Sequence, residues 1–299
     1  MPISSPPFDI NQLNAEQQRL FHAAFDELKS SRGSYLEYKL NLPLKTKFDS
    51  DEEENEWHYE LYRFLRARKW SVPHTVRAVL DMMQWRKENN IDSLLEQEAV
   101  ANRLQLIRAM FPGVHHGYTK AHGPLYIEKS GLMPVNKVLT QFTTEELIQT
   151  HIYWLEICCQ RARERSRQLG IHVENFTMIY DMKGCKLSMR KCLPIFRQSF
   201  QIDNNYYPER LGHMIALNPP AVFPVLWNLV KPWLDPVTKT KIVVVKKGPE
   251  AATTLLQYID ADQLPQEYGG SCKACSTAPD CLPVSEENKN IVEDEQEEE

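Results

Sequence analysis

Few side chains in this 299-residue sequence have the types and spacing that catalysis requires. Cys159 and Arg165 have the Cys-x5-Arg spacing of a cysteine phosphatase, in which a glycine-rich loop after a strand points backbone amides at phosphate. Here both residues belong to "ICCQRARERSR", which contains no glycine and has the character of the middle of a helix. We therefore expect no phosphatase site.

Candidate metal ligands are equally sparse. His115 and His116 form an isolated pair, which we interpret as a solvated loop pair. Cys272, Cys275 and Cys281 begin a CxxC pattern, but a fourth ligand and a second CxxC are missing. The patterns GxGxxG, GxxxxGK[ST], GxSxG and HExxH are also absent from the sequence. We therefore expect neither an enzyme nor a metal site.

Composition and charge narrow the class of protein further. Residues 286–299 contain eight acids and one lysine, so the formal charge of −5 conceals a slightly basic body and an acidic tail. No stripe of Lys and Arg interleaved with aromatic residues suggests a nucleic-acid partner. The start lacks the features of a signal peptide, and no apolar run reaches the roughly 18 residues of a membrane span. Seven cysteines without an export signal are typical of reduced thiols, so we expect a cytoplasmic protein.

The first third of the chain has helical periodicity. A helix is expected from about Asn14, a second over "WHYELYRFLRARKW" from Trp57, and a third starting at Ser71 and Pro73.

Beyond about residue 111 the apolar period changes to that of strands. Short apolar segments, expected to be strands, occupy residues 123–129, 174–182, 213–218 and 241–247. Helical segments separate or follow them at 145–169, 187–203, 221–234 and 249–258. This alternation predicts an α/β domain with a mainly parallel sheet.

Four motifs in order, "RFLRARKW", "WRKENNID", "YYPERLG" and "KPWLDPVTKTKI", resemble those of the CRAL-TRIO lipid-binding family. The likeness is closest to the Sec-fourteen-like phosphatidylinositol transfer proteins. It extends from about residue 57 to about residue 271 and includes "LPQEYGG". The resemblance implies a helical N-terminal unit beside an α/β fold whose sheet floors an apolar lipid cavity. We expect a disordered N-terminus at 1–13, the helical unit at 14–110, the lipid-binding domain at 111–271 and a disordered acidic tail at 272–299.

The resemblance also implies a headgroup site. An inositol phosphate needs cations for its phosphodiester and carboxylates or hydroxyls for its ring. In phosphatidylinositol-binding members this work falls to positions that match six residues here: Arg68, Lys69, Glu209, Asp235, Thr238 and Lys241. The alternative is that Arg68 and Lys69 only complement a helix C-terminus, while Glu209 pairs with Arg210 at the surface.

Two apolar groups complete the expectation. The residues expected to line the cavity, or simply to form core, are Tyr126, Phe176, Met178 and Tyr180. Segment 221–234 matches the family's gating helix, where the residues of interest are Phe223, Leu226, Trp227 and Val230. An ordinary helix packed on the sheet would account for this apolar face equally well.

One departure from the family pattern concerns phosphatidylcholine, the second lipid that some members carry besides phosphatidylinositol. Members that carry phosphatidylcholine have a serine and a threonine where this chain has Phe176 and Met178, neither of which can hydrogen-bond a phosphodiester. Tyr126 matches the family, but the tyrosine expected upstream is His115. The departure argues against phosphatidylcholine and for an apolar second ligand such as a sterol, or none.

The function expected from the resemblance is non-enzymatic lipid transfer or presentation by a cytoplasmic protein. Its ligand would be phosphatidylinositol, bound without a cofactor or metal. It would act as a monomer that contacts endomembranes such as the Golgi peripherally and transiently. Two alternatives are a carrier of another hydrophobic ligand, of the sterol, retinoid or tocopherol type, and a scaffold whose acidic tail recruits a partner.

Overall fold

The computed structural model describes residues 8–30 and 51–272, with side chains from Asn55 onward in the second range. The chain divides into two compact units. The helical unit comprises Met1–Gln97, Ser166–His172 and Ile202–Arg210, and the sheet unit comprises Glu98–Arg165, Val173–Gln201 and Leu211–Glu299. The domain boundaries predicted at residues 110 and 271 stay predictions.

Three α-helices build most of the helical unit: α1 (Ala15–Ser30), α2 (Asp51–Ala67) and α3 (Val72–Glu88). Asn14 and Gln17 cap α1 reciprocally, because the Asn14 side chain accepts from Gln17 N and the Gln17 side chain accepts from Asn14 N. Ser71 is the N-cap residue of α3, and a proline occupies its first turn, as predicted. A 3-10 helix, Ile91–Glu96, follows α3.

Apolar stripes of the three helices form one core. Trp57, Leu61 and Phe64 of α2 are at most 1% exposed and pack with Phe21 and Met83 of the other two helices. The amphipathic spacing in the sequence therefore predicts these helices and their buried faces correctly.

The predicted disordered N-terminus is wrong for residues 8–13, which form a 3-10 turn at Ile10–Gln12 capped by Asp9. The Phe8 ring stacks on Phe21 at 5.2 Å, and Leu13 is buried. Residues 1–7 and the predicted acidic tail beyond Cys272 lie outside the described residues.

The sheet unit contains a five-stranded sheet with strand order β1-β2-β3-β4-β5. Its strands are β1 (Gly113–Tyr118), β2 (Pro124–Glu128), β3 (Phe176–Asp181), β4 (Leu211–Leu217) and β5 (Ile242–Val245). β1 pairs with β2 antiparallel, and the other neighbours pair in parallel. The predicted α/β class with a mainly parallel sheet is confirmed.

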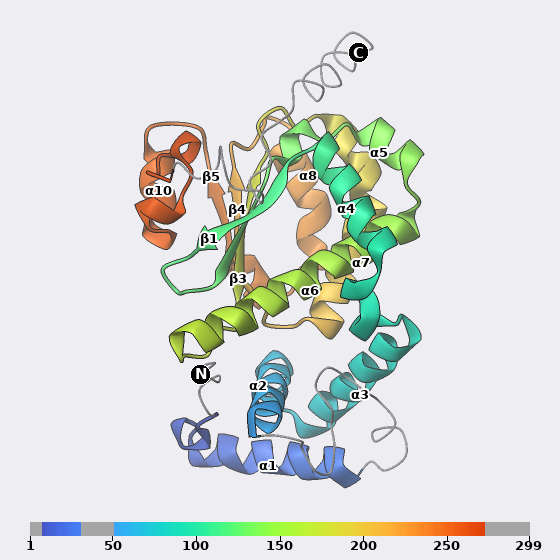
Figure 1. The fold of residues 1–299 in the computed structure, drawn as a ribbon, viewed down its shortest axis with the longest axis vertical. Coiled ribbons are helices and arrows are strands. Elements are labelled where there is room, and N and C mark those ends of the chain that lie inside the picture. Colours follow the sequence, from blue (N-terminus) through green and yellow to red (C-terminus); the bar gives the residue numbers. More distant parts are fainter. Residues whose placement is uncertain (1–7, 31–50, 273–299) are drawn as a thin grey trace. The chain divides into compact units, whose positions relative to one another are not determined.

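Helices occupy both sides of this sheet (Figure 1). In chain order they are α4 (Glu98–Met110), α5 (Val135–Gln141), α6 (Thr144–Leu169), α7 (Leu193–Tyr206), α8 (Phe223–Val230), α9 (Pro236–Thr240) and α10 (Glu250–Tyr258). Short 3-10 helices lie at Ser130–Leu132, Leu187–Cys192, Lys231–Trp233, Ala261–Gln263 and Gln266–Tyr268. The last turns of α6 and α7 belong to the helical unit.

The two faces of the sheet differ in their cover. On one, which we call the α10 face, Ile127, Ile179 and Ile215 pack with Leu255 of α10 in a closed apolar core. On the other, the α6 face, Trp154 of α6 packs against the sheet. Figure 1 shows α10 on one side of the sheet and α4, α5 and α8 on the other.

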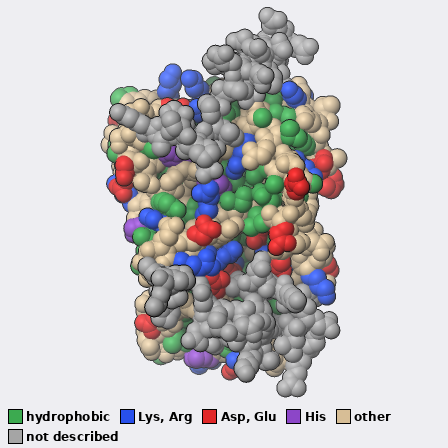
Figure 2. Space-filling view, in the orientation of Figure 1, with side chains coloured by type: hydrophobic (Ala, Val, Ile, Leu, Met, Phe, Trp, Pro, Cys, Tyr) green, Lys and Arg blue, Asp and Glu red, His purple; other side chains and the backbone are tan. Residues whose placement is uncertain are grey.

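The surface is mixed in character. Figure 2 shows hydrophobic side chains reaching the surface in groups between charged ones. In the described part of the chain, no helix is both long and apolar enough to cross a membrane.

Candidate functional site

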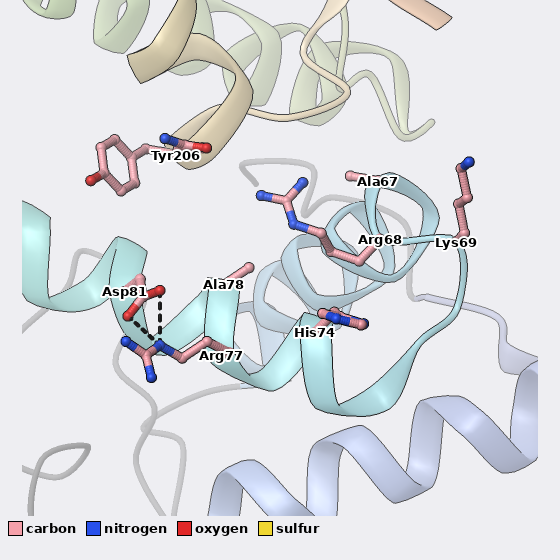
Figure 3. Close-up of a pocket in the computed structure, with 9 residues that line it drawn as sticks. Ala67, Arg68, Lys69, His74, Arg77, Ala78, Asp81 and Tyr206 are labelled. Carbon is pink, nitrogen blue, oxygen red and sulfur yellow. Dashed lines mark hydrogen bonds and ion pairs between the residues drawn. The ribbon is translucent and has the colours of Figure 1, made fainter. Parts of the chain in front are cut away.

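A pocket of about 420 Å³ opens in the helical unit where α2 meets α3 (Figure 3). Its lining residues are Ala67, Arg68, Lys69, His74, Arg77, Ala78, Asp81, Asn205 and Tyr206. Tyr206 is fixed by stacking on Trp85, with ring centroids 4.1 Å apart and planes 9° from parallel. Two of the six predicted headgroup residues therefore line one preformed pocket.

The end of α2 positions these two cations. Lys69 N donates to Arg66 O at 3.0 Å and Trp70 N donates to Leu65 O at 2.8 Å, which is the Schellman pattern of a helix C-terminus. Lys69 accordingly has a left-handed backbone with φ of +51°. In Figure 3 the Arg68 side chain reaches across the pocket toward Tyr206, whereas Lys69 extends away from it.

The pocket has more positive than negative side chains among the residues that line it. Asp81, the acidic lining residue, is 2.8 Å from Arg77 Nε. Among the described residues, no carboxylate pairs with Arg68 or Lys69, and Arg68 Nη2 lies 3.4 Å from the carbonyl oxygen of Asn204. Burial and the nearby charge of Arg63 lower the pKa of Arg68. A half-buried guanidinium in this situation favours an anionic ligand.

The turn that carries Glu209 is held by a buried ionic network. Arg210 and Arg63 both donate to Glu60 of α2, and Arg63 also donates to the carbonyl oxygen of Pro208. Burial lowers the pKa of Arg210 to about 10, and the negative charge of Glu56 acts in the opposite direction. Arg210 is therefore a buried residue that pairs with Glu60, and the alternative pairing of Glu209 with Arg210 stays a prediction. Glu209 is half-buried, with a left-handed φ of +60°.

The other three predicted headgroup residues lie together around α9 of the sheet unit. The Asp235 carboxylate caps α9 by accepting from Val237 N at 2.8 Å and from Thr238 N at 3.0 Å, and the Thr238 hydroxyl also donates to it. Burial acts to raise the pKa of Asp235, but these hydrogen bonds outweigh it and the pKa is lowered. Lys241 ends the same helix and is half-buried.

The six residues therefore form two groups, one in each unit. Arg68, Lys69 and Glu209 belong to the helical unit, whereas the α9 group belongs to the sheet unit. A single headgroup site built from all six stays a prediction.

The four predicted cavity-lining residues share the α6 face. Tyr126 of β2 is the cross-strand partner of Met178 of β3, and Phe176 and Tyr180 lie two residues before and after Met178. Trp154 packs on this group, with its ring 5.0 Å from Tyr126 and 5.5 Å from Phe176. Their common face agrees with the alternation in the sequence, while their contact with a lipid stays a prediction.

The α-helix in the predicted gating segment, residues 221–234, is shorter than expected and has apolar side chains on more than one face. α8 covers Phe223–Val230, and Leu226 packs into a small core with Met189 and Cys192. The predicted residues Phe223, Leu226, Trp227 and Val230 have i, i+3, i+4, i+7 spacing and are buried or half-buried. Val225 and Leu229, which we did not single out, are 56% and 46% exposed and give α8 a second, outward apolar face.

A buried polar cluster on the α6 face was missed by the sequence analysis. His115 lies on β1 and is 7% exposed, and His116 is 6% exposed, so the predicted solvated loop pair is wrong. Next to His115, the Tyr126 hydroxyl lies 3.3 Å from a Glu128 oxygen, and the Ser130 hydroxyl donates to Glu128 at 2.7 Å. Burial raises the pKa of Glu128. The signal available in the sequence was the spacing by two of Tyr126, Glu128 and Ser130.

The structure also places the residues of the phosphatase-like and metal-ligand patterns. Cys159 and Arg165 lie within α6, where Arg165 stacks its guanidinium 4.0 Å above the Tyr118 ring. Across residues 8–30 and 51–272, no group of three or more His, Cys, Asp or Glu side chains is arranged to hold a metal ion. Cys275 and Cys281 lie outside the described residues.

Comparison with known proteins identifies the family. The model of the CRAL/TRIO domain matches residues 108–270. The chain belongs to the CRAL/TRIO family. The match includes the α9 group and Glu209 but begins after Arg68 and Lys69, which therefore lie outside the CRAL/TRIO domain model.

Several curated CRAL/TRIO relatives are about one-third identical to this chain. A CRAL-TRIO domain-containing protein of Caenorhabditis elegans is 32% identical over 270 residues, which are 88% of this chain and 36% of the relative. The phosphatidylinositol/phosphatidylcholine transfer protein SFH9 of Arabidopsis thaliana is 32% identical, over 75% of this chain and 39% of the relative. The SEC14 cytosolic factor of Eremothecium gossypii is 34% identical, over 70% of this chain and 68% of the relative.

These CRAL/TRIO relatives differ in size from the chain. It spans about two-fifths of the length of the first two and about two-thirds of the third. The crystal structure of Sfh5 has the same fold, with a TM-score of 0.66 at 19% identity, covering 96% of this chain and 99% of that one.

Proposed function

We propose that this protein binds phosphatidylinositol and transfers or presents it between membranes without catalysing a reaction. The observation that carries the proposal is the pocket at the end of α2, where Arg68 and Lys69 have no acidic partner among the residues that the structure describes. A phosphodiester would supply the missing negative charge. The relatives named phosphatidylinositol/phosphatidylcholine transfer proteins support the same ligand class.

The apolar part of the ligand would lie against the α6 face. A phospholipid with roughly 30 chain methylenes loses about 0.8 kcal/mol for each one exposed to water, or about 24 kcal/mol in total. A carrier must therefore cover both chains, and we place them against the sheet face that Tyr126, Phe176, Met178 and Tyr180 share. Exchange requires an opening at a membrane, and the exposed Val225 and Leu229 of α8 supply apolar side chains that can enter a bilayer.

The proposed place of action follows from this ligand. Phosphatidylinositol is extracted and delivered at membrane surfaces, so we propose a cytoplasmic monomer that visits endomembranes such as the Golgi peripherally. No cofactor takes part in the proposed cycle.

A transfer assay with purified protein tests the proposal. Labelled phosphatidylinositol moves from donor to acceptor vesicles, and Arg68→Ala and Glu209→Ala are each expected to reduce its initial rate by about tenfold or more, since each loses a charge that contacts the headgroup. Arg77→Ala is the matched control, because Arg77 lines the same pocket but already pairs with Asp81. Unfolding curves identical to wild type would show that the loss is not one of folding. Full transfer by both Arg68→Ala and Glu209→Ala would refute the site.

A second candidate, a carrier of another hydrophobic ligand, is favoured by one observation. Phe176 and Met178 are 3% and 5% exposed and offer no hydrogen bond to a phosphodiester on the α6 face. Mass spectrometry of lipids that copurify from a eukaryotic host separates the two candidates. Phosphatidylinositol as the main lipid supports the first, and a sterol or isoprenoid in its place supports the second.

A further inference from the structure

Three exposed lysines follow the carboxyl ends of two strands of the sheet. Lys183 comes after β3 and lies in a tight turn, in which Cys185 N donates to Met182 O at 3.0 Å. Lys246 and Lys247 come directly after β5. Because β3, β4 and β5 are parallel neighbours (Figure 1), the three lysines lie at one edge of the sheet. We call these three residues the lysine edge.

The register of the sheet fixes the spacing of the lysine edge. Asp181, at the end of β3, is the cross-strand partner of Leu217, and Leu217 is the cross-strand partner of Val245 at the end of β5. Two strand spacings, or roughly 10 Å, therefore separate the ends of β3 and β5. The three positive charges follow these two ends within one or two residues.

The acids at this edge of the sheet do not neutralise these lysines. Asp181 is buried and accepts from the Tyr268 hydroxyl at 3.2 Å, and Glu267 pairs with Lys129 at 2.8 Å. Glu250 begins α10 and is exposed. Among the described residues, no carboxylate forms an ion pair with a side chain of the lysine edge. A short row of like charges without acids between them favours an anionic partner.

The last described residues of the chain are held at the same edge. The Tyr268 hydroxyl reaches Asp181 at the end of β3, and Cys272 N donates to Leu264 O at 3.1 Å. Cys272 is four residues beyond Tyr268, so their Cα atoms are at most about 14 Å apart. The segment that follows Cys272 therefore starts beside the lysine edge.

This following segment has the opposite charge. Residues 286–299 contain eight acids and one lysine, and residues 273–285 connect them to Cys272. A connection of this length spans roughly 20 Å as a flexible coil and at most about 45 Å when extended. Residues 286–299 can therefore reach the lysine edge. Such a tether gives an effective concentration roughly in the millimolar range, so that weak charge pairing is sufficient for binding.

The turn that carries Lys183 packs beside α8. Met182 and Cys185 of this turn share an apolar core with Leu226 of α8. The same helix carries the outward apolar face that we expect at a bilayer. A segment bound at Lys183 would therefore lie next to the proposed membrane contact.

We propose that residues 286–299 dock on the lysine edge of the same chain and screen it from anionic membranes. This segment is favoured over a bilayer as the resting occupant, because it starts beside the edge and is tethered there. The inference goes beyond the proposed function, since it identifies an intramolecular partner for a surface outside the proposed headgroup site. The screening rests on the proposed function in one respect, the contact of α8 with membranes.

Carbodiimide coupling of the full chain tests the docking. The reagent joins a lysine amine to a carboxylate that is in contact with it, and mass spectrometry of the digested protein identifies the joined residues. An equal mixture of ordinary and isotope-labelled protein distinguishes coupling within one chain from coupling between copies. At low salt we expect residues 286–299 to couple to the lysine edge of the same chain. The yield should fall about tenfold in about 1 M NaCl, where charges are screened within about 3 Å.

Lys239 is the matched control for this experiment. It lies in α9, which precedes β5, so it is at the opposite edge of the sheet. Its side chain has no acidic partner in the part of the chain that the structure describes. Coupling of residues 286–299 to Lys239 as often as to the lysine edge, coupling only between copies, or no coupling would each overturn the proposal.

Sedimentation with vesicles tests the screening. In the full chain, the combined changes Glu293→Gln, Asp294→Asn and Glu295→Gln should increase affinity for vesicles of phosphatidylcholine and phosphatidylserine about fivefold or more, since lysines near an anionic surface are attracted to it. Affinity for vesicles of phosphatidylcholine alone should not change. Replacing the lysine edge by glutamines in the same variant should remove the gain. Equal affinity of wild type and the acid variant for anionic vesicles would refute the screening.

The coupling experiment does not require phosphatidylinositol transfer, so the two proposals can fail separately. If residues 286–299 couple to the lysine edge but the protein transfers no phosphatidylinositol, the proposed function fails and the docking stands. If the protein transfers phosphatidylinositol without such coupling, only the docking fails.

Discussion

Replacing Glu60 by glutamine should destabilise the helical unit more than any single loss of its arginine partners. Glu60 is flanked by Arg63 and Arg210, and all three side chains are at most 10% exposed. Glu60→Gln keeps the shape of the side chain but leaves two buried guanidinium groups facing a neutral amide. Arg210→Met, by contrast, leaves the pair of Glu60 and Arg63 intact.

The expected magnitudes follow from this geometry. Removing one partner of a buried ion pair typically costs about 3–5 kcal/mol, and Glu60→Gln breaks two such pairs, so we expect at least about 3 kcal/mol. Arg210→Met loses one charged hydrogen bond, worth about 1.5–3 kcal/mol, and it also relieves the burial of one charge. Its cost should therefore fall below that of Glu60→Gln. Because whole domains are stable by only about 5–15 kcal/mol, the difference is easily measured.

Urea unfolding followed by tryptophan fluorescence is a suitable assay. The midpoints of wild type and variants are compared where the dependence of the unfolding free energy on urea concentration, the m-value, is unchanged. Arg19→Ala is a control, since the ion pair of Arg19 with Glu16 is exposed and its loss should leave the midpoint unchanged. The reasoning would be refuted if Glu60→Gln stayed within about 1 kcal/mol of wild type, or if Arg210→Met were the more damaging change.

Two further predictions concern the sheet unit. Gly131→Ala should lower the unfolding free energy by about 2 kcal/mol or more, because the new Cβ would lie 2.0 Å from the Lys183 carbonyl oxygen. Gly248→Ala is the control and should be nearly neutral, because a Cβ atom there would have nothing within 4 Å. Equal effects of the two substitutions in urea unfolding would contradict this prediction. Burial and the charges of Arg161 and Arg108 hold the pKa of His115 well below its ordinary value of 6.5, so the unfolded chain takes up the proton first as pH falls. The contribution of His115 to stability should therefore be constant above about pH 6.5 and fall below it by up to about 1.4 kcal/mol per pH unit. His115→Phe should remove that share of the slope in unfolding curves measured from pH 7.5 to 5, and an unchanged slope would show that His115 is not buried in its neutral form.

The sequence predicts those elements whose local pattern agrees with their final burial. Four strands and the long helix α6 were found because apolar periodicity, Gly170 and flanking polar residues mark them. β1 was missed because "GVHHGY" has one branched residue, Val114, and no apolar alternation, and its strand form depends on pairing with β2. The predicted helix 187–203 begins as a 3-10 helix and becomes α7 at Leu193, where Pro194 can occupy a first turn but not an interior.

Residues of the proposed headgroup site could be named from the sequence only through a family motif. The role of Arg210 depends on Glu60, which is 150 positions away, and no local pattern specifies such a pairing. A signal was nevertheless present: Glu60 has helical spacing from Trp57 and Phe64, so it lies on the apolar face of α2, where a charge requires a partner. The contacts of His115 were missed for a similar reason, since His115, Tyr126 and Trp154 come from β1, β2 and α6 and meet only in the fold.

The left-handed backbone at Lys69 and Glu209 lowers folding stability at two residues that belong to the proposed headgroup site. A side chain other than glycine or asparagine in that conformation costs of the order of 1 kcal/mol. An engineer seeking a more heat-resistant protein from backbone geometry alone would therefore replace these two residues by glycine first. Both belong to the proposed headgroup site, so the more robust protein would be the poorer carrier.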